Sequence, residues 1–179
     1  MPIRKQPLYV LVGVDVRRGT NDGTSRANTV SKLALPELKH KTTNFAPGGG
    51  VGERSIVLPQ LEPILPKFEL KGFDDEIMAS MGFMPGINDI WTFAGALVDK
   101  QAGTTVPARA IIKGNIATFT PDESEIGGLM GCNYEIQEVT HYEFTIDGKE
   151  HWYVDLDENE IRVGGVSRSA DVNRALGIA

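Results

Sequence analysis

Residues 142–156 read YEFTIDGKEHWYVDL, and this stretch decides the fold class. Aromatic and β-branched residues alternate with polar ones on both sides of Asp147-Gly148, a dipeptide typical of two-residue hairpin turns. The stretch predicts one strand over Asn133–Ile146 and a returning strand over Trp152–Leu156, which continues at Glu160–Val163.

Similar patterns predict strands through most of the chain. The other expected strands are Tyr9–Val16, Val30–Leu38, Ser55–Leu61, Phe68–Phe73, Ile90–Asp99 and Val106–Phe119. Lys100–Gly103 is expected to join the last two as a hairpin. A short helix is expected over Asp74–Gly82, where acidic residues suit the first turn. Another is expected between Ser169 and Gly177.

Two polar, glycine-rich segments separate the N-terminal strands. They cover residues 17–29 and 39–54, and Gly48-Gly49-Gly50 lies within the second. Such glycine runs do not hold one backbone conformation without outside contacts. We therefore expect one mainly β domain over residues 1–179, a β-sandwich or barrel with one short flanking helix and long loops at 17–29 and 39–54.

Composition narrows the class of protein. The chain has 179 residues, of which 41% are hydrophobic and 23% charged, and this balance argues against gross disorder. The formal net charge is −6, which excludes tight binding of nucleic acid by bulk positive charge. No apolar run reaches the length of about 18 residues that a membrane span needs, so no membrane anchor is expected.

No motif for catalysis or cofactor binding stands out. The single cysteine, Cys132, excludes an internal disulfide and an all-cysteine metal site. The run Gly48–Gly52 lacks the Gly-Lys-Ser/Thr of a phosphate loop. Asp155, Asp157 and Asn159 resemble half of a calcium loop, but Glu160 replaces its glycine. We expect no cofactor and no metal.

Catalysis by a histidine is the remaining enzymatic interpretation, and it ranks last among the possible functions. His141 and His151 could face each other across the Asp147-Gly148 turn, a pairing that needs no catalysis. The aromatic set of this half is expected in the core. It consists of Phe93, Phe119, Tyr134, Tyr142, Phe144 and Trp152.

A β-rich chain with open sheet edges and long arms, and without a recognisable active site, can form assemblies by head-to-tail contacts that close into rings. The order of segments supports this option. The segments that carry the resemblance are VSKLALPELK (30–39), FELKGF (68–73), FAGA (93–96), IKGN (112–115), YEFTIDGKE (142–150), DENEIRVGGVSR (157–168) and NRALG (173–177). In this order they resemble the major tail tube proteins of contractile-tailed bacteriophages, which are also similar to R-type pyocin tubes.

The resemblance implies a structural protein and not an enzyme. It implies hexameric rings whose inner sheets join into one continuous β-barrel, stacked into a tube inside a contractile sheath. The implied partners are further copies of the chain, sheath, baseplate and tail terminator proteins, and double-stranded DNA that passes without specific binding. The implied location is the virion tail, assembled in the host cytoplasm. An acidic lumen would repel DNA phosphates, so we expect part of the negative charge to line it.

Contacts between subunits are expected from the two arms. The residues predicted to make them are Arg17, Arg18, Asn21, Phe45, Pro47, Gly49, Glu53 and Arg54. The acidic side of the first helix, Asp74, Asp75 and Glu76, is expected to face outward, towards the sheath or a neighbouring subunit. The alternative is that this helix covers one face of a sheet.

Three other functions stay open at this point. A contractile bacteriocin or secretion tube shares the fold and carries no DNA. A small-molecule-binding β-barrel predicts a monomer with a closed apolar cavity. An enzyme would use His141 or His151.

Overall fold

A computed structural model describes residues 6–20, 23–81, 88–123 and 125–178. In these ranges the strands are β1 Tyr9–Arg18, β2 Val30–Ala34, β3 His40–Phe45, β4 Arg54–Leu61, β5 Lys67–Lys71, β6 Asp89–Asp99, β7 Thr105–Pro121, β8 Gly131–Ile146, β9 Lys149–Asp155, β10 Glu160–Val163 and β11 Val166–Ser167. The helices are α1 Asp75–Ser80 and α2 Ala170–Leu176. The predicted mainly β fold is confirmed.

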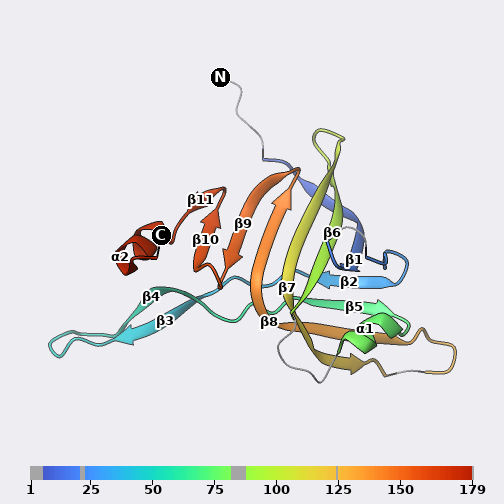
Figure 1. Cartoon of the computed structure of the whole chain (residues 1–179), viewed down its shortest axis with the longest axis horizontal. Helices are drawn as coiled ribbons and strands as arrows, with labels where there is room; N and C mark the ends of the chain where they lie inside the picture. Colours follow the sequence, from blue (N-terminus) through green and yellow to red (C-terminus); the bar gives the residue numbers. More distant parts are fainter. Residues whose placement is uncertain (1–5, 21–22, 82–87, 124, 179) are drawn as a thin grey trace.

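The larger of the two sheets is antiparallel and is built around β8. Its order is β1-β6-β7-β8-β9-β10-β11, and β5 with its partner β2 also pairs with β8 (Figure 1). The C-terminal half of β8 pairs with β9 from His141 to Ile146, whereas its N-terminal end pairs with β5 from Gly131 to Glu135. The long strand thus connects the main sheet to the β2–β5 pair.

Aromatic side chains join these two parts into one core. Phe68 of β5 stacks on Tyr134 with ring centroids 5.1 Å apart and meets Phe93 of β6 edge to face at 5.7 Å. Trp91 is fully buried and donates its indole N–H to the carbonyl of Gly114. Phe93, Tyr134 and Tyr142 are buried as predicted, but Trp152 is exposed.

The turn chemistry read from the sequence is confirmed. Asp147 and Gly148 have φ values of 52° and 71°, and both lie in the left-handed region that a type I′ hairpin requires. In the connection between β6 and β7, the N–H of Asp99 donates to the carbonyl of Thr104 and closes the predicted hairpin.

The segment 39–54 is more regular than we predicted. Its first part forms β3, which pairs with β4 from His40↔Leu61 to Phe45↔Arg54, so only residues 46–53 form a loop. The sequence HKTTNF gave no alternation because every residue of β3 is exposed. The strand predicted over Val30–Leu38 is also shorter and ends at Ala34.

Both predicted helices are present. Asp74 accepts the N–H of Ile77 and caps α1, while the predicted end at Gly82 lies outside the described residues. Helix α2 runs between Ser169 and Gly177, whose φ of 71° ends it. Ser169 does not cap α2 with its side chain. Its hydroxyl donates to Glu160 and accepts from the N–H of Ile161.

Candidate assembly surfaces

The β3–β4 hairpin projects from the rest of the molecule (Figure 1). Among the described strands, β3 and β4 pair only with each other. An isolated two-stranded hairpin is at best marginally stable in water. Three apolar side chains of this hairpin, Phe45, Ile56 and Val57, are exposed. The hairpin therefore has the properties of an arm that another molecule covers.

The tip of this hairpin gathers five of the predicted contact residues. Phe45 ends β3 opposite Arg54, whose guanidinium lies 5.6 Å from the centre of the Phe45 ring. Pro47, Gly49 and Glu53 are exposed in the loop between them. Their contact with another subunit stays a prediction.

Arg17 and Arg18 lie in strand β1 and not in the loop that we predicted. Arg17 donates to Asp15 at 2.7 Å, and Arg18 forms an ion pair with Asp89 of the neighbouring strand. Both arginines thus have partners within the chain. Asn21 lies outside the described residues.

A buried arginine fastens the predicted arm 17–29 to helix α1. The Nε of Arg26 lies 2.6 Å from Asp74 Oδ2, and its Nη2 lies 2.8 Å from Glu76 Oε2. Burial alone would lower the pKa of Arg26. The hydrogen bonds and negative charges of the two carboxylates outweigh the effect of burial, so the pKa of Arg26 is raised. The backbone N–H of Arg26 also donates to Asp15. This part of the arm is therefore ordered by its own chain.

The same ion pairs engage two of the three acidic residues that we expected to face outward, and the contact of α1 with the sheath or a neighbouring subunit stays a prediction. Asp74 and Glu76 turn towards Arg26, whereas Asp75 is exposed. Burial works to raise the pKa of Asp74, but the hydrogen bonds from Arg26 and from the N–H of Ile77 outweigh it and lower the pKa. No pattern in the sequence marks Arg26, because it stands among polar residues that look solvated.

The face of the main sheet away from the core is polar and carries both signs of charge. Glu143 and Tyr153 are paired across β8 and β9, and Tyr153 lies beside Arg162 of β10. The Arg162 guanidinium lies 3.5 Å from the centre of the Tyr153 ring and pairs with Glu150. Charged neighbours on this face are thus matched across strands.

The predicted pair of His141 and His151 is wrong. His141 lies opposite Asp155, with 3.0 Å between Nδ1 and Oδ2. Burial alone would raise the pKa of Asp155. The hydrogen bonds of this carboxylate with the backbone N–H of Glu158 and with the His141 ring outweigh the effect of burial, so the pKa of Asp155 is lowered. A bulge between Phe144 and Thr145 shifts the register, so His151 has no residue of β8 paired directly with it.

The chain's one thiol is not placed to act with this histidine. Burial raises the pKa of the Cys132 thiol, which disfavours the reactive thiolate. Cys132 lies in the part of β8 that pairs with β5, opposite Leu70, whereas His141 lies in the part that pairs with β9, opposite Asp155. The two side chains therefore do not form a nucleophile–base pair.

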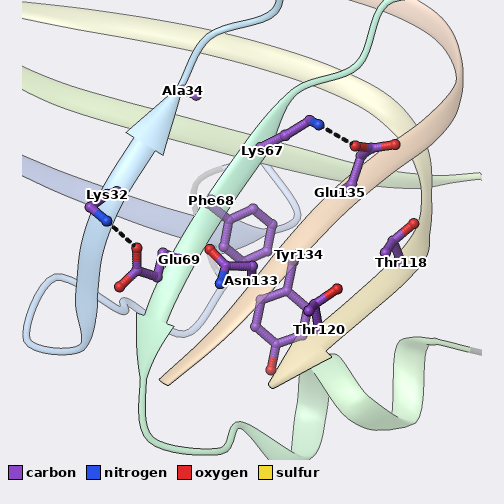
Figure 2. A pocket seen from close by; sticks show the side chains of 10 residues that line it. All are labelled: Lys32, Ala34, Lys67, Phe68, Glu69, Thr118, Thr120, Asn133, Tyr134 and Glu135. Carbon is purple, nitrogen blue, oxygen red and sulfur yellow. Dashed lines mark ion pairs between the residues drawn. The ribbon is translucent and has the colours of Figure 1, made fainter. Parts of the chain in front are cut away.

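A hollow of about 290 Å³ lies where β2 and β5 meet β7 and β8 (Figure 2). Its rim carries two ion pairs, Lys32–Glu69 and Lys67–Glu135. Figure 2 shows Phe68 between these pairs and Tyr134 beneath Phe68. Its charged rim does not resemble the closed apolar cavity that a ligand-binding barrel requires.

Two further kinds of feature are missing from the described residues. Among them, no group of three or more His, Cys, Asp or Glu side chains is placed to hold a metal ion. No helix within the described ranges is long and apolar enough to cross a membrane.

Comparison with known proteins decides the family. Residues 17–177 match the family described as "Phage tail tube protein FII". The chain belongs to this tail tube family. Its members are structural proteins and not enzymes. The family match begins at Arg17 and includes the β3–β4 hairpin, the polar sheet face and α2.

Two kinds of relative agree with this membership. The tail tube protein of Escherichia phage P2 is 24% identical over 159 residues, which are 88% of this chain and 92% of the relative. The fold is similar to a chain of the sheath/tube terminator of an extracellular contractile injection system, PVC, with a TM-score of 0.53, 9% identity and coverage of 81% and 99%. A chain of the PVC sheath-tube complex matches with a TM-score of 0.50, 10% identity and coverage of 74% and 87%.

Proposed function

We propose that this chain forms hexameric rings that stack into the tail tube of a contractile phage, inside a sheath, and that the tube conducts DNA into the host. The observation that carries the proposal is the β3–β4 hairpin, which projects without covering its own apolar side chains. In a stack of rings, neighbouring subunits cover such an arm and supply the contacts that it lacks within its chain.

Open sheet edges support ring formation. Among the described strands, the main sheet ends at β1 on one side and at β11 on the other. The first half of β1 exposes Leu11 and Val12 at this edge. Joining edges of neighbouring subunits in a closed ring removes the unpaired strand edges that otherwise template aggregation. This geometry fits a continuous inner barrel.

The polar sheet face fits the wall of a conduit. We propose that the face carrying Glu143 and Tyr153 lines the lumen. Arg162 on this face is engaged by the carboxylate of Glu150 and by the Tyr153 ring. A channel of this kind offers DNA phosphates few free cations, which keeps retention by counterion release low.

The partners follow from the same proposal. Solved relatives come from a sheath-tube complex and a sheath/tube terminator. By analogy, we propose that the tube protein contacts sheath, baseplate and terminator proteins and resides in the virion tail.

Electron microscopy of the purified chain tests the ring proposal. We expect rings or hollow tubes of uniform width from the parent chain, and none after deletion of Ala46–Gly52. Leu156→Ala, which removes an exposed apolar side chain away from the tip, is the matched control and should assemble normally. Normal tubes from the deletion variant would contradict the role of the hairpin.

A tube without DNA transport is the second candidate function. The likeness to an extracellular contractile injection system favours it. The composition of particles that contain this chain distinguishes the two candidate functions, because a phage tail is attached to a DNA-filled capsid. Particles with a sheath and no DNA would support the bacteriocin or secretion tube.

A further inference from the structure

Helix α2 lies on the surface without a partner of its own. None of its residues is buried, and Val172 and Leu176 are exposed, Leu176 at 64%. Its contacts with the rest of the chain are polar, for example those between Asn173 and Asn159. A helix of 7 residues is too short to be stable by itself in water. Another surface is therefore needed to cover its apolar side.

A matching surface lies at the opposite end of the molecule. The connection between β7 and β8 exposes Ile126, Leu129 and Met130, with Leu129 at 81%. In Figure 1 this connection reaches one end of the longest axis, while α2 lies towards the other end. The two apolar surfaces therefore do not meet within one chain.

Their charges are complementary. Glu123 and Glu125 are exposed on the β7–β8 connection. Arg168 and Arg174 are exposed at α2, and the contact of Arg174 with Asp171 is between two largely exposed groups, which makes it weak. An apolar loop with two exposed glutamates thus lies at one end, and at the other end lies an apolar helix with exposed Arg168 and Arg174 and a single exposed acid, Asp171. Complementary charge of this kind selects a partner and fixes its orientation.

We propose that α2 of one subunit docks on the β7–β8 connection of the next subunit. The contact is head-to-tail, because the two surfaces differ and lie at opposite ends. A contact of this type repeats around a ring and closes it. The proposal rests on the proposed ring assembly and assigns the contact to these two elements.

Disulfide trapping in the assembled protein tests this contact. Leu129→Cys together with Leu176→Cys should give a ladder of covalent oligomers under mild oxidation, while each single substitution should not. Native Cys132 is fully buried and contributes little. The matched control pairs Leu129→Cys with Leu156→Cys, which also replaces an exposed leucine outside α2. Equal ladders from both pairs would overturn the proposal.

Charge reversal adds a readout that misfolding cannot imitate. In the double-cysteine background, Glu125→Arg or Arg174→Glu alone should slow ladder formation about tenfold, and the two together should restore most of the rate. No rescue by the combined variant would contradict the contact. Rings seen by electron microscopy without a ladder would overturn this contact and leave the ring proposal intact. Absence of rings in the parent chain together with absence of a ladder in the double-cysteine variant would overturn both.

Discussion

Arg26 and Asp74 are 48 residues apart in the sequence and form an ion pair in which the Arg26 side chain is 2% exposed. Glu76 completes the contact from the same helix. Through this pair, the segment that follows β1 is fixed to the start of α1. The part of the arm that we expected to be available for other subunits is held by its own chain, and the β3–β4 hairpin is the arm that remains uncovered.

Replacing Arg26 tests the strength of this link. Arg26→Met should lower the free energy of unfolding by about 2–3 kcal/mol, below the roughly 3–5 kcal/mol of a fully buried pair, because the carboxylates keep contact with water. Urea unfolding of the monomer measures the loss. Arg174→Met, at an exposed ion pair, should change stability by no more than about 0.5 kcal/mol. Equal losses would contradict the assigned role of Arg26.

Acid stability should depend on Glu69. Hydrogen bonds from Lys71 and then Lys32 lower the pKa of Glu69 from 4.5 to about 2. Because the folded-state pKa lies below the unfolded value, this contribution is present above about pH 4.5 and is lost as the pH falls towards 2. Glu69→Gln should therefore reduce the fall in the urea midpoint over this range.

The exposed carboxylate of Glu158 gives the matched control for this experiment. Glu158→Gln should leave the acid dependence as in the parent chain. An unchanged dependence in Glu69→Gln would show that Lys71 and Lys32 do not stabilise the fold through this carboxylate.

Two phenylalanines should separate folding from assembly. Phe68 is buried against Tyr134 and Phe93, so Phe68→Ala should cost about 3–5 kcal/mol of monomer stability. Phe45 is 46% exposed on β3, so Phe45→Ala should leave the unfolding midpoint nearly unchanged and reduce tube yield. Thermal unfolding and electron microscopy of both variants check this. Intact assembly of Phe45→Ala would contradict the role of the hairpin tip.

Gly114 in β7 should not tolerate a larger residue, because neighbouring atoms leave no room for an added Cβ. A Cβ at Gly114 would lie 2.8 Å from the carbonyl oxygen of Gln137 and 2.9 Å from a methyl of Ile136. Gly114→Ala should therefore destabilise the chain by about 1–3 kcal/mol. Gly52→Ala has open space around the added atom and should be near neutral. Chemical denaturation of the two variants makes the comparison.

DNA passage gives a further prediction under the proposed function. Glu143 lies on the polar sheet face that we assign to the lumen, so Glu143→Lys should slow DNA ejection by adding a cation to the channel. Glu143→Gln, which adds no positive charge, should have a smaller effect. Ejection kinetics that do not change with Glu143→Lys would contradict this assignment.

The parts of the fold that depend on local chemistry could be predicted from the sequence. Asp147-Gly148 specifies a turn by its own backbone preferences, and the hairpin follows from it. The pairing of β5 with β8 joins residues such as Phe68 and Tyr134, which are far apart in the chain, and no local pattern encodes it. Strand β3 was missed because period-two alternation reflects burial, and this strand buries nothing.

The candidate contact residues also divide into those that a local sequence pattern predicts and those whose position depends on tertiary contacts. The loop between Phe45 and Arg54 could be predicted because a glycine-rich run marks a loop without a core, and the contact of this loop with another subunit stays a prediction. Arg17 and Arg18 were misplaced because charged residues can continue a strand when carboxylates such as Asp15 and Asp89 lie beside them. The link from Arg26 to Asp74 needs the tertiary structure and has no signature in sequence.

A reconstruction of assembled tubes by electron cryo-microscopy tests the central claim most directly. The account predicts rings of six subunits in which sheet edges join around the lumen and the β3–β4 hairpin lies against a neighbouring subunit. A chain that stays monomeric at high concentration, or a tube in which the hairpin projects into solvent, would contradict it.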